Sequence, residues 1–90
     1  RVAQLYYGLL RRLRIGLPRP SETLREHYSS ISSSLAPRPR LARYLWWLLV
    51  LVERDLYSSR KPSYEEALDL YEGALVSARY EGTPGAPREE

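Results

Sequence analysis

Nine consecutive apolar residues, Tyr44 to Val52, are enclosed by charged residues in the stretch RYLWWLLVLVER at positions 43–54. An α-helix rises about 1.5 Å per residue, so this run reaches only about half of a hydrocarbon core that is about 30 Å thick. Arg43 and Glu53 also flank the run too closely for a membrane span. We therefore predict that this stretch is the core helix of a small bundle and not a membrane segment.

The predicted core helix, about residues 40–57, has apolar side chains on two faces when successive residues are placed about 100° apart. Its main stripe consists of Leu41, Leu45, Leu48, Val52 and Leu56. Trp47 and Val50 lie roughly opposite this stripe, with Trp46 beside them. This second side must pack on another helix, contact a partner or stay exposed. Trp46, Trp47 and Val50 are therefore candidate interaction residues.

Two helices are predicted before the core helix. Apolar residues at helical spacing cover residues 2–15, and Gly16 with the prolines after it is typical of a helix end that has glycine in a left-handed cap. The next helix begins at Thr23, because Thr23 and Glu26 have the spacing of a reciprocal capping box. Its serine-rich second half has low helix propensity, so we expect this helix to fray near Ser33.

The last helix begins with a second capping box, from Ser63 to Glu66, and places Gly73 toward solvent together with its acidic residues. From Glu81 onward, proline and glycine replace the apolar period. Four helices without a strand pattern predict an all-α fold, a small four-helix bundle with short loops, which favours antiparallel neighbours. Residues 1–80 form a single helical domain, and residues 81–90 form a disordered C-terminal tail or linker.

The formal charge of +3 is unevenly distributed along the chain. Residues 1–45 have a net charge of +7, and residues 46–90 have a net charge of −4. The basic half contains a cluster of arginines, Arg11, Arg12, Arg14 and Arg19. This cluster fits a solvated helix end that meets its own C-terminal dipole, a juxtamembrane segment beside anionic lipid, or a nucleic-acid contact. We take it as the candidate contact with a membrane surface or an acidic partner.

The sequence offers little for catalysis or metal binding. It contains no cysteine, and His27 is its single histidine. A lone histidine on a helix is most often a solvated or half-packed side chain, and the carboxylates of the last helix have the spacing of a solvated face. We therefore expect no catalytic residue, no cofactor and no metal site.

Three stretches taken together, YYGLLRRLRIGLPRPSETLREH, LLVLVERDLYSS and PSYEEALDLYEGAL, resemble a known family. They are similar to the helical C-terminal domain of unknown function from multi-pass transglutaminase-like membrane proteins. The family's cap is matched by Thr23, Arg25 and Glu26, whereas Leu24 stands where the family has proline. The family's later signature is matched by Glu53, Arg54, Tyr57 and Ser58. The resemblance implies a domain on the cytoplasmic side, with its basic first helix beside lipid, and assigns none of the family's catalytic residues to this chain.

These observations predict a non-catalytic cytoplasmic interaction or regulatory domain at the C-terminal end of a transglutaminase-like membrane protein. The expected partner is another protein or another domain of the parent chain, and an anionic membrane surface and a homodimer are further expectations. Because the chain begins at Arg1 and contains no methionine, we expect that it was cut from a longer protein with a membrane segment upstream of Arg1. The alternative is a small basic domain that binds nucleic acid through the arginine cluster.

Overall fold

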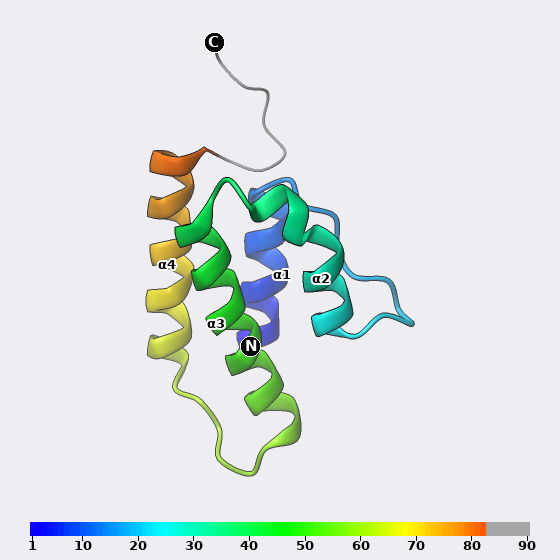
Figure 1. The fold of residues 1–90 in the computed structure, drawn as a ribbon. Helices are drawn as coiled ribbons and strands as arrows, with labels where there is room; N and C mark the ends of the chain where they lie inside the picture. The colour runs from blue at the N-terminus through cyan, green and yellow to red at the C-terminus, as the bar shows by residue number, and fades with distance from the viewer. Residues whose placement is uncertain (83–90) are drawn as a thin grey trace.

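The computed structural model describes residues 1–82, which contain four α-helices and no strand (Figure 1). The helices are α1 (Val2–Arg12), α2 (Leu24–Leu35), α3 (Pro39–Tyr57) and α4 (Tyr64–Glu81). The predicted all-α four-helix bundle is therefore confirmed. Helix α4 includes Glu81, the first residue of the predicted tail, and residues 83–90 of that tail lie outside the described residues.

The helices form a core of three with a fourth on one side. Helices α1, α3 and α4 pack together, whereas α2 has α3 as its one close helical neighbour within residues 1–82. Helices α1 and α2 point in the same direction, because segment 13–23 returns along the bundle before α2 begins (Figure 1). The expected antiparallel arrangement of consecutive helices holds for α2 with α3 and for α3 with α4, but not for this first pair.

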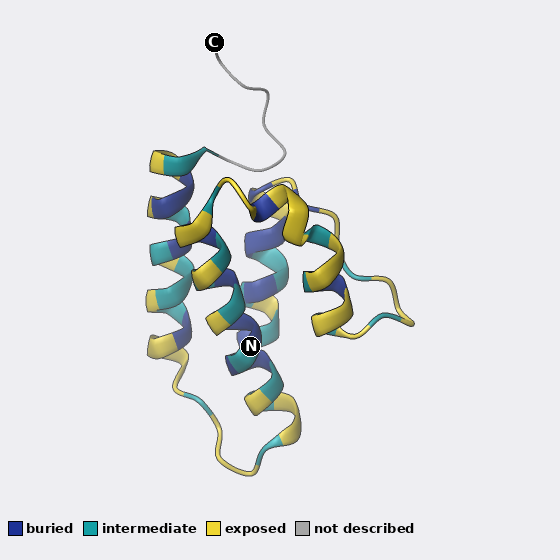
Figure 2. Cartoon of the chain, viewed as in Figure 1, coloured by how far each residue is buried: buried dark blue, intermediate teal, exposed yellow. Residues whose placement is uncertain are grey.

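The core helix follows the predicted stripe over most of its length. Four members of the stripe are fully buried, namely Leu41, Leu45, Leu48 and Val52. Leu56 is 53% exposed, because the last turn of α3 extends past the ends of α1 and α4 (Figures 1 and 2). Leu49 and Leu51 are also buried, so α3 contacts its neighbours over a wider arc than the stripe alone.

Small side chains let α4 approach α3 closely. The buried positions of α4 are Ala67, Ala74, Ser77 and Ala78. Gly73, which the sequence pattern places toward solvent, instead lies under the ring of Tyr44, where a Cβ atom would overlap the ring. The reason is that a glycine on the flank of the buried stripe leaves room for an aromatic side chain from the neighbouring helix.

Helix α1 ends at Arg12, three residues before the predicted end. Arg14, and not Gly16, adopts the left-handed conformation, with φ of 59°. The amide of Ile15 donates to the carbonyl of Leu10 at 2.9 Å and the amide of Arg14 donates to that of Arg11 at 3.1 Å, which is the Schellman pattern. Ile15 and Leu10 are both buried, so apolar packing at this helix end holds a non-glycine residue in the cap.

Helix α2 begins with the predicted capping box. The Thr23 hydroxyl accepts from the amide of Glu26 at 3.1 Å, and the Glu26 carboxylate accepts from the amide of Thr23 at 2.9 Å. These hydrogen bonds hold the pKa of Glu26 below its ordinary value. The helix continues through the serine run to buried Leu35. At α4 only half of the predicted box forms within the described residues, because Ser63 accepts from an amide but receives no reciprocal bond.

His27 is buried, and not solvated or half-packed as expected. Its Nε2 lies 2.6 Å from the carbonyl oxygen of Gly16, so the imidazole joins α2 to the returning segment 13–23. Its Nδ1 is buried without a hydrogen-bond partner among residues 1–82. The sequence pattern misses this role because the partner is a backbone atom of a loop.

Polar contacts join the beginning of α3 to the end of α4. The Glu81 carboxylate accepts from the amides of Arg40 at 3.1 Å and Leu41 at 2.9 Å, in the first turn of α3. The Arg38 side chain donates from Nε to the carbonyl of Gly82 at 2.7 Å. Helix α3 has neither an acidic residue in its first turn nor a side-chain cap of its own. Glu81 therefore supplies the N-terminal cap of α3 from the far end of α4.

Replacing Tyr6 by phenylalanine is expected to raise the free energy of unfolding by about 1 kcal/mol, because a buried hydroxyl without a partner carries a desolvation cost. The Tyr6 ring is fully buried in α1, and its hydroxyl has no partner within the described residues. Burial, together with Tyr28 and Tyr7, raises the pKa of Tyr6. Denaturant unfolding monitored by circular dichroism measures the change.

The raised pKa also gives the stability of the protein a pH dependence. The phenol of the unfolded chain ionises near pH 10, whereas the phenol of the folded protein stays neutral there. The free energy of unfolding therefore keeps its full value with respect to Tyr6 below pH 10 and falls as the pH rises further. The phenylalanine variant has no phenol at this position that could ionise. It should lose stability less steeply than the wild type between about pH 9 and pH 11. An equal slope in both proteins, or a variant less stable than the wild type at neutral pH, would contradict the prediction.

Candidate functional site

A concave surface lies beside α2, and we call it the α1–α3 groove. Its volume is about 710 Å³. It is lined by Tyr7 and Arg11 of α1, residues 17–25, and Glu53, Leu56 and Tyr57 of α3. A volume of this size is within the usual range of ligand-binding clefts.

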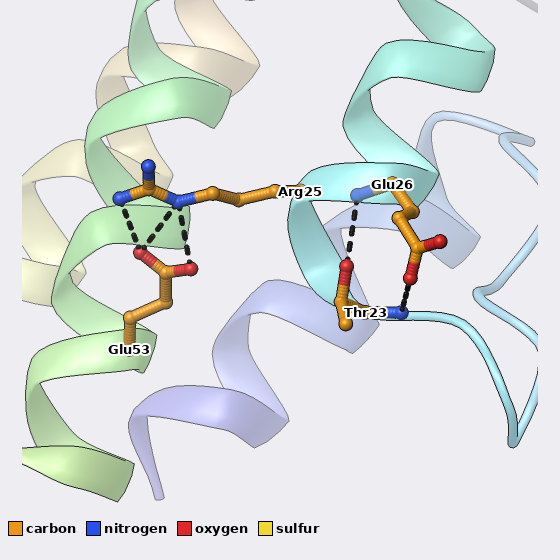
Figure 3. A network of polar contacts seen from close by, with 4 residues as sticks. All are labelled: Thr23, Arg25, Glu26 and Glu53. Atoms are coloured by element: carbon orange, nitrogen blue, oxygen red, sulfur yellow. Dashed lines mark hydrogen bonds and ion pairs between the residues drawn. The ribbon is translucent and has the colours of Figure 1, made fainter.

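The returning segment forms one wall of the α1–α3 groove. After the left-handed turn at Arg14, the chain crosses to a tight turn in which the amide of Glu22 donates to the carbonyl of Arg19 at 3.0 Å. The Glu22 carboxylate in turn accepts from the amide of Arg19 at 3.2 Å. This turn leads directly into the capping box at Thr23 (Figure 3). Local hydrogen bonds therefore set the position of Arg19.

Among the residues that line the groove, Arg25 of α2 pairs with Glu53 of α3 (Figure 3). The guanidinium donates from Nε and Nη2 to both carboxylate oxygens, at distances of 2.9 to 3.1 Å. The same guanidinium lies 5.3 Å from the ring centroid of Trp46. Arg25 is thereby neutralised, whereas Arg11 and Arg19 have no carboxylate within ion-pair distance among residues 1–82.

The predicted arginine cluster is exposed throughout, but the groove takes only part of it. Arg11 and Arg19 line the groove, whereas Arg12 and Arg14 lie outside its lining. The groove adds apolar residues that the sequence patterns do not identify as a site. Leu17 and Leu56 are both exposed, and Tyr57 is 83% exposed. The spacing of Leu56 predicts a core position, so the sequence does not indicate that Leu56 lines the groove.

The candidate interaction residues of α3 are divided between two environments. Trp46 is half-buried, and its ring packs edge-on against Tyr28 of α2 at a centroid distance of 5.3 Å. The Tyr28 hydroxyl donates to the carbonyl of Ala42 at 3.1 Å, so Tyr28 fixes α2 on this side of α3. Trp47 is 51% exposed, and Val50 is partly exposed. Thus α2 covers Trp46, while Trp47 remains accessible.

A smaller groove runs between α3 and α4, on the side of α3 away from α2. Its volume is about 470 Å³. It is lined by Arg40, Arg43, Tyr44, Gly73, Val76, Ser77 and Tyr80. Trp47 follows Arg43 by four residues and Arg40 by seven, so it continues the same face of α3. Arginine and aromatic side chains of this kind are enriched at protein interfaces.

Residues 1–82 contain no group of three or more His, Asp or Glu side chains that could hold a metal ion. None of the helices in this range has both the length and the apolar character needed to cross a membrane. No family model, curated protein or solved structure matches the chain. The residues that line the two grooves carry guanidinium, carboxylate, hydroxyl, phenol and aliphatic groups, which bind by charge, hydrogen bonding and apolar contact.

Proposed function

We propose that this chain is a non-catalytic helical interaction domain that binds an anionic membrane surface through the α1–α3 groove. The observation that carries the proposal is the combination of two unneutralised guanidinium groups, Arg11 and Arg19, with three exposed apolar side chains around one opening. Anionic headgroups are the natural counter-charge for these arginines. The apolar side chains then have a favourable environment at the boundary between headgroups and acyl chains.

The charge of the groove supports an anionic partner. The residues that line the groove include three arginines, Arg11, Arg19 and Arg25, and two glutamates, Glu22 and Glu53, which give a formal charge of +1. Of the two carboxylates in the lining, Glu53 is paired with Arg25 and Glu22 accepts from a backbone amide. Both carboxylates thus already have partners within the chain, so the guanidinium groups of Arg11 and Arg19 remain available to a ligand.

The placement of the apolar residues favours a lipid surface over a protein segment. A cleft built for a peptide buries its apolar anchors in its base. Here the large apolar groups Leu17, Leu56 and Tyr57 are exposed and come from two separate segments around one opening. Leucine and tyrosine beside basic residues are typical of segments that lie in the membrane interface.

The family resemblance supports the same proposal from a separate direction. A C-terminal domain of a transglutaminase-like membrane protein would lie on the cytoplasmic side, with α1 beside anionic lipid. In that setting the domain would be tethered upstream of Arg1, and the groove would orient it on the bilayer. Protein partners, including other parts of the parent chain, would then meet the face that points away from the lipid.

Vesicle flotation tests the proposal. The chain should float with phosphatidylcholine vesicles that contain about 30% phosphatidylglycerol and remain unbound with pure phosphatidylcholine. Replacing both Arg11 and Arg19 by glutamine should weaken binding about thirtyfold, since each basic residue near such a surface contributes about 1 kcal/mol. Replacing Leu56 and Tyr57 by serine should weaken binding even at high salt, where the electrostatic part is screened.

The matched control removes the same amount of charge elsewhere, by replacing Arg43 and Arg54 with glutamine. Both are exposed on α3 and neither lines the α1–α3 groove. The control should bind anionic vesicles nearly as well as the wild type. Equal losses in the two arginine pairs would mean that net charge alone drives binding and would overturn the proposed site. Failure of the wild type to bind anionic vesicles would overturn the function.

Nucleic acid is the second candidate, because Tyr7, Tyr57 and Arg11 line one groove and single-strand binding combines aromatic with basic side chains. It predicts binding to a single-stranded oligonucleotide at low salt, measured by fluorescence anisotropy, with steep weakening as salt is added. Absence of binding at about 50 mM salt would eliminate this candidate.

A further inference from the structure

The outward face of the α3–α4 pair is the second accessible surface of the molecule, and α2 leaves it open (Figure 2). We call it the outer face. It carries exposed Trp47 on α3 and exposed Val76 and Tyr80 on α4. Spacing along α4 places Val76 in line with Glu65, Asp69 and Glu72, which are all exposed. This face lies on the other side of α3 from the α1–α3 groove, because Glu53 and Trp46 face α2.

The outer face has a basic end and an acidic end. The antiparallel register of α3 and α4 is set by the contact of Tyr44 with Gly73 and by the bonds from Glu81 to the first turn of α3. In this register, the N-terminal part of α3 lies beside the C-terminal part of α4. The basic end therefore contains Arg40, Arg43 and Arg79. The acidic end contains Glu65 and Asp69, with Arg54 beside them, and Glu72 lies between the two ends.

The exposed tryptophan lies between these two ends. With a rise of about 1.5 Å per residue, Trp47 is about 6 Å beyond Arg43 along α3, and Asp69 is about 6 Å beyond Gly73 along α4 in the same direction. Asp69 and Glu65 thus lie at and beyond the level of Trp47, whereas Glu72, one residue before Gly73, lies near the level of Leu45. A surface with opposite charges on either side of an apolar centre is complementary to itself.

We propose that the outer face pairs with the outer face of a second copy of this chain. In a twofold dimer each contact occurs twice, so the basic end of one copy would lie on the acidic end of the other. The two Trp47 side chains would meet near the axis, where a large aromatic residue contributes most to an interface. This pairing does not depend on the proposed lipid contact, because the α1–α3 groove stays free in it.

Sedimentation equilibrium of the full chain tests the pairing, from about 3 µM to about 300 µM, which covers dissociation constants in the micromolar range. At low ionic strength the wild type should pass from monomer to dimer over this range. Replacing Arg40 and Arg43 by glutamate should weaken self-association at least tenfold, and so should replacing Glu65 and Asp69 by arginine, because like charges then face each other.

The decisive measurement mixes these two charge-reversed variants. Each is repelled by its own kind, but in the mixed pair every reversed end meets a reversed partner, so a heterodimer should form with nearly the wild-type affinity. Replacing Trp47 by alanine should weaken self-association about thirtyfold. As the matched control, reversing Arg11 and Arg19 to glutamate changes the charge by the same amount on the groove and should leave dimerisation unchanged.

Three results would each overturn the pairing. They are a wild-type chain that stays monomeric at about 300 µM, charge-reversed variants that fail to form a mixed dimer, and unaltered self-association after loss of Trp47. Vesicle flotation of the Trp47 variant separates this inference from the proposed function. A monomeric variant that still floats with anionic lipid leaves the function intact, and a dimer that does not float leaves the pairing intact.

Discussion

Replacing Leu45 by alanine is expected to lower the free energy of unfolding by about 3 kcal/mol. Leu45 is fully buried in the middle of α3, where α1 and α4 pack on the same helix. The substitution removes apolar contacts and leaves a cavity that the surrounding helices fill only in part. For a domain of this size the loss is a large fraction of the total stability. Urea unfolding monitored by far-ultraviolet circular dichroism gives the difference directly.

Leu56 provides the matched comparison, since the same sequence stripe contains both leucines. Its side chain is 53% exposed on the projecting last turn of α3, so replacement by alanine should cost less than about 1 kcal/mol. Alanine also has a helix propensity at least as favourable as that of leucine. Similar losses at the two positions would contradict the described end of the bundle, because they would require Leu56 to be buried.

The second large effect is expected at Glu81, where replacement by alanine should cost about 1.5 kcal/mol. The Glu81 carboxylate accepts hydrogen bonds from two amides in the first turn of α3, and that turn itself contains no acidic residue. Its loss leaves these donors without their partner and removes a negative charge from the positive end of the helix dipole. Replacement by glutamine keeps an acceptor and should cost about half as much. Thermal and denaturant unfolding both measure the loss.

Glu72 is the control for this experiment, because it is exposed on the same helix and no hydrogen bond to its side chain is found within the described residues. Its replacement by alanine should change stability by less than about 0.5 kcal/mol. Hydrogen exchange adds a local readout: in the Glu81 variant, the amides of Arg40 and Leu41 should exchange faster than in the wild type. Unchanged exchange at these two amides would show that the carboxylate does not cap α3 in solution.

Local sequence patterns were sufficient to predict the helices and much of the core. The Thr23–Glu26 capping box depends on residues three apart, and it forms as predicted. The stripe from Leu41 to Val52 depends on the period of a single helix, and its members are buried as predicted. The all-α class follows from the same two kinds of signal. Both signals involve residues that are close together in the sequence, so they can be recognised without knowing how the helices are arranged.

The features that the sequence did not predict depend on residues far apart in the chain. The sequence pattern assigns Glu81 to a tail, because the amide of Leu41, which Glu81 caps, lies 40 residues earlier in the chain. His27 was expected to be half-packed because its partner is the carbonyl of Gly16 on a loop. Arg14 takes a left-handed conformation that its own side chain disfavours, since packing of the residues around it determines the turn. Each of these depends on tertiary contacts.

The candidate surfaces show the same division. Exposure of Arg11 and Arg19 follows from their charge, and the sequence identified both. Their meeting with Leu56 and Tyr57 around one groove required the path of segment 13–23, which no local pattern specifies. The separation of Trp46 from Trp47 likewise required the position of α2. The sequence therefore named two of the arginines that line the groove, and the fold added Arg25, Glu22, Glu53 and the apolar residues.

Attachment of α2 to a single helical neighbour gives the domain two levels of cooperativity. The Arg25–Glu53 pair, the Tyr28 contacts and the imidazole of His27 join α2 to the rest, and they can break while α1, α3 and α4 stay folded. Such a partial opening would expose Trp46 and free segment 13–23, which contains Arg19. One local equilibrium would then govern the indole surface of α3 and the shape of the α1–α3 groove together.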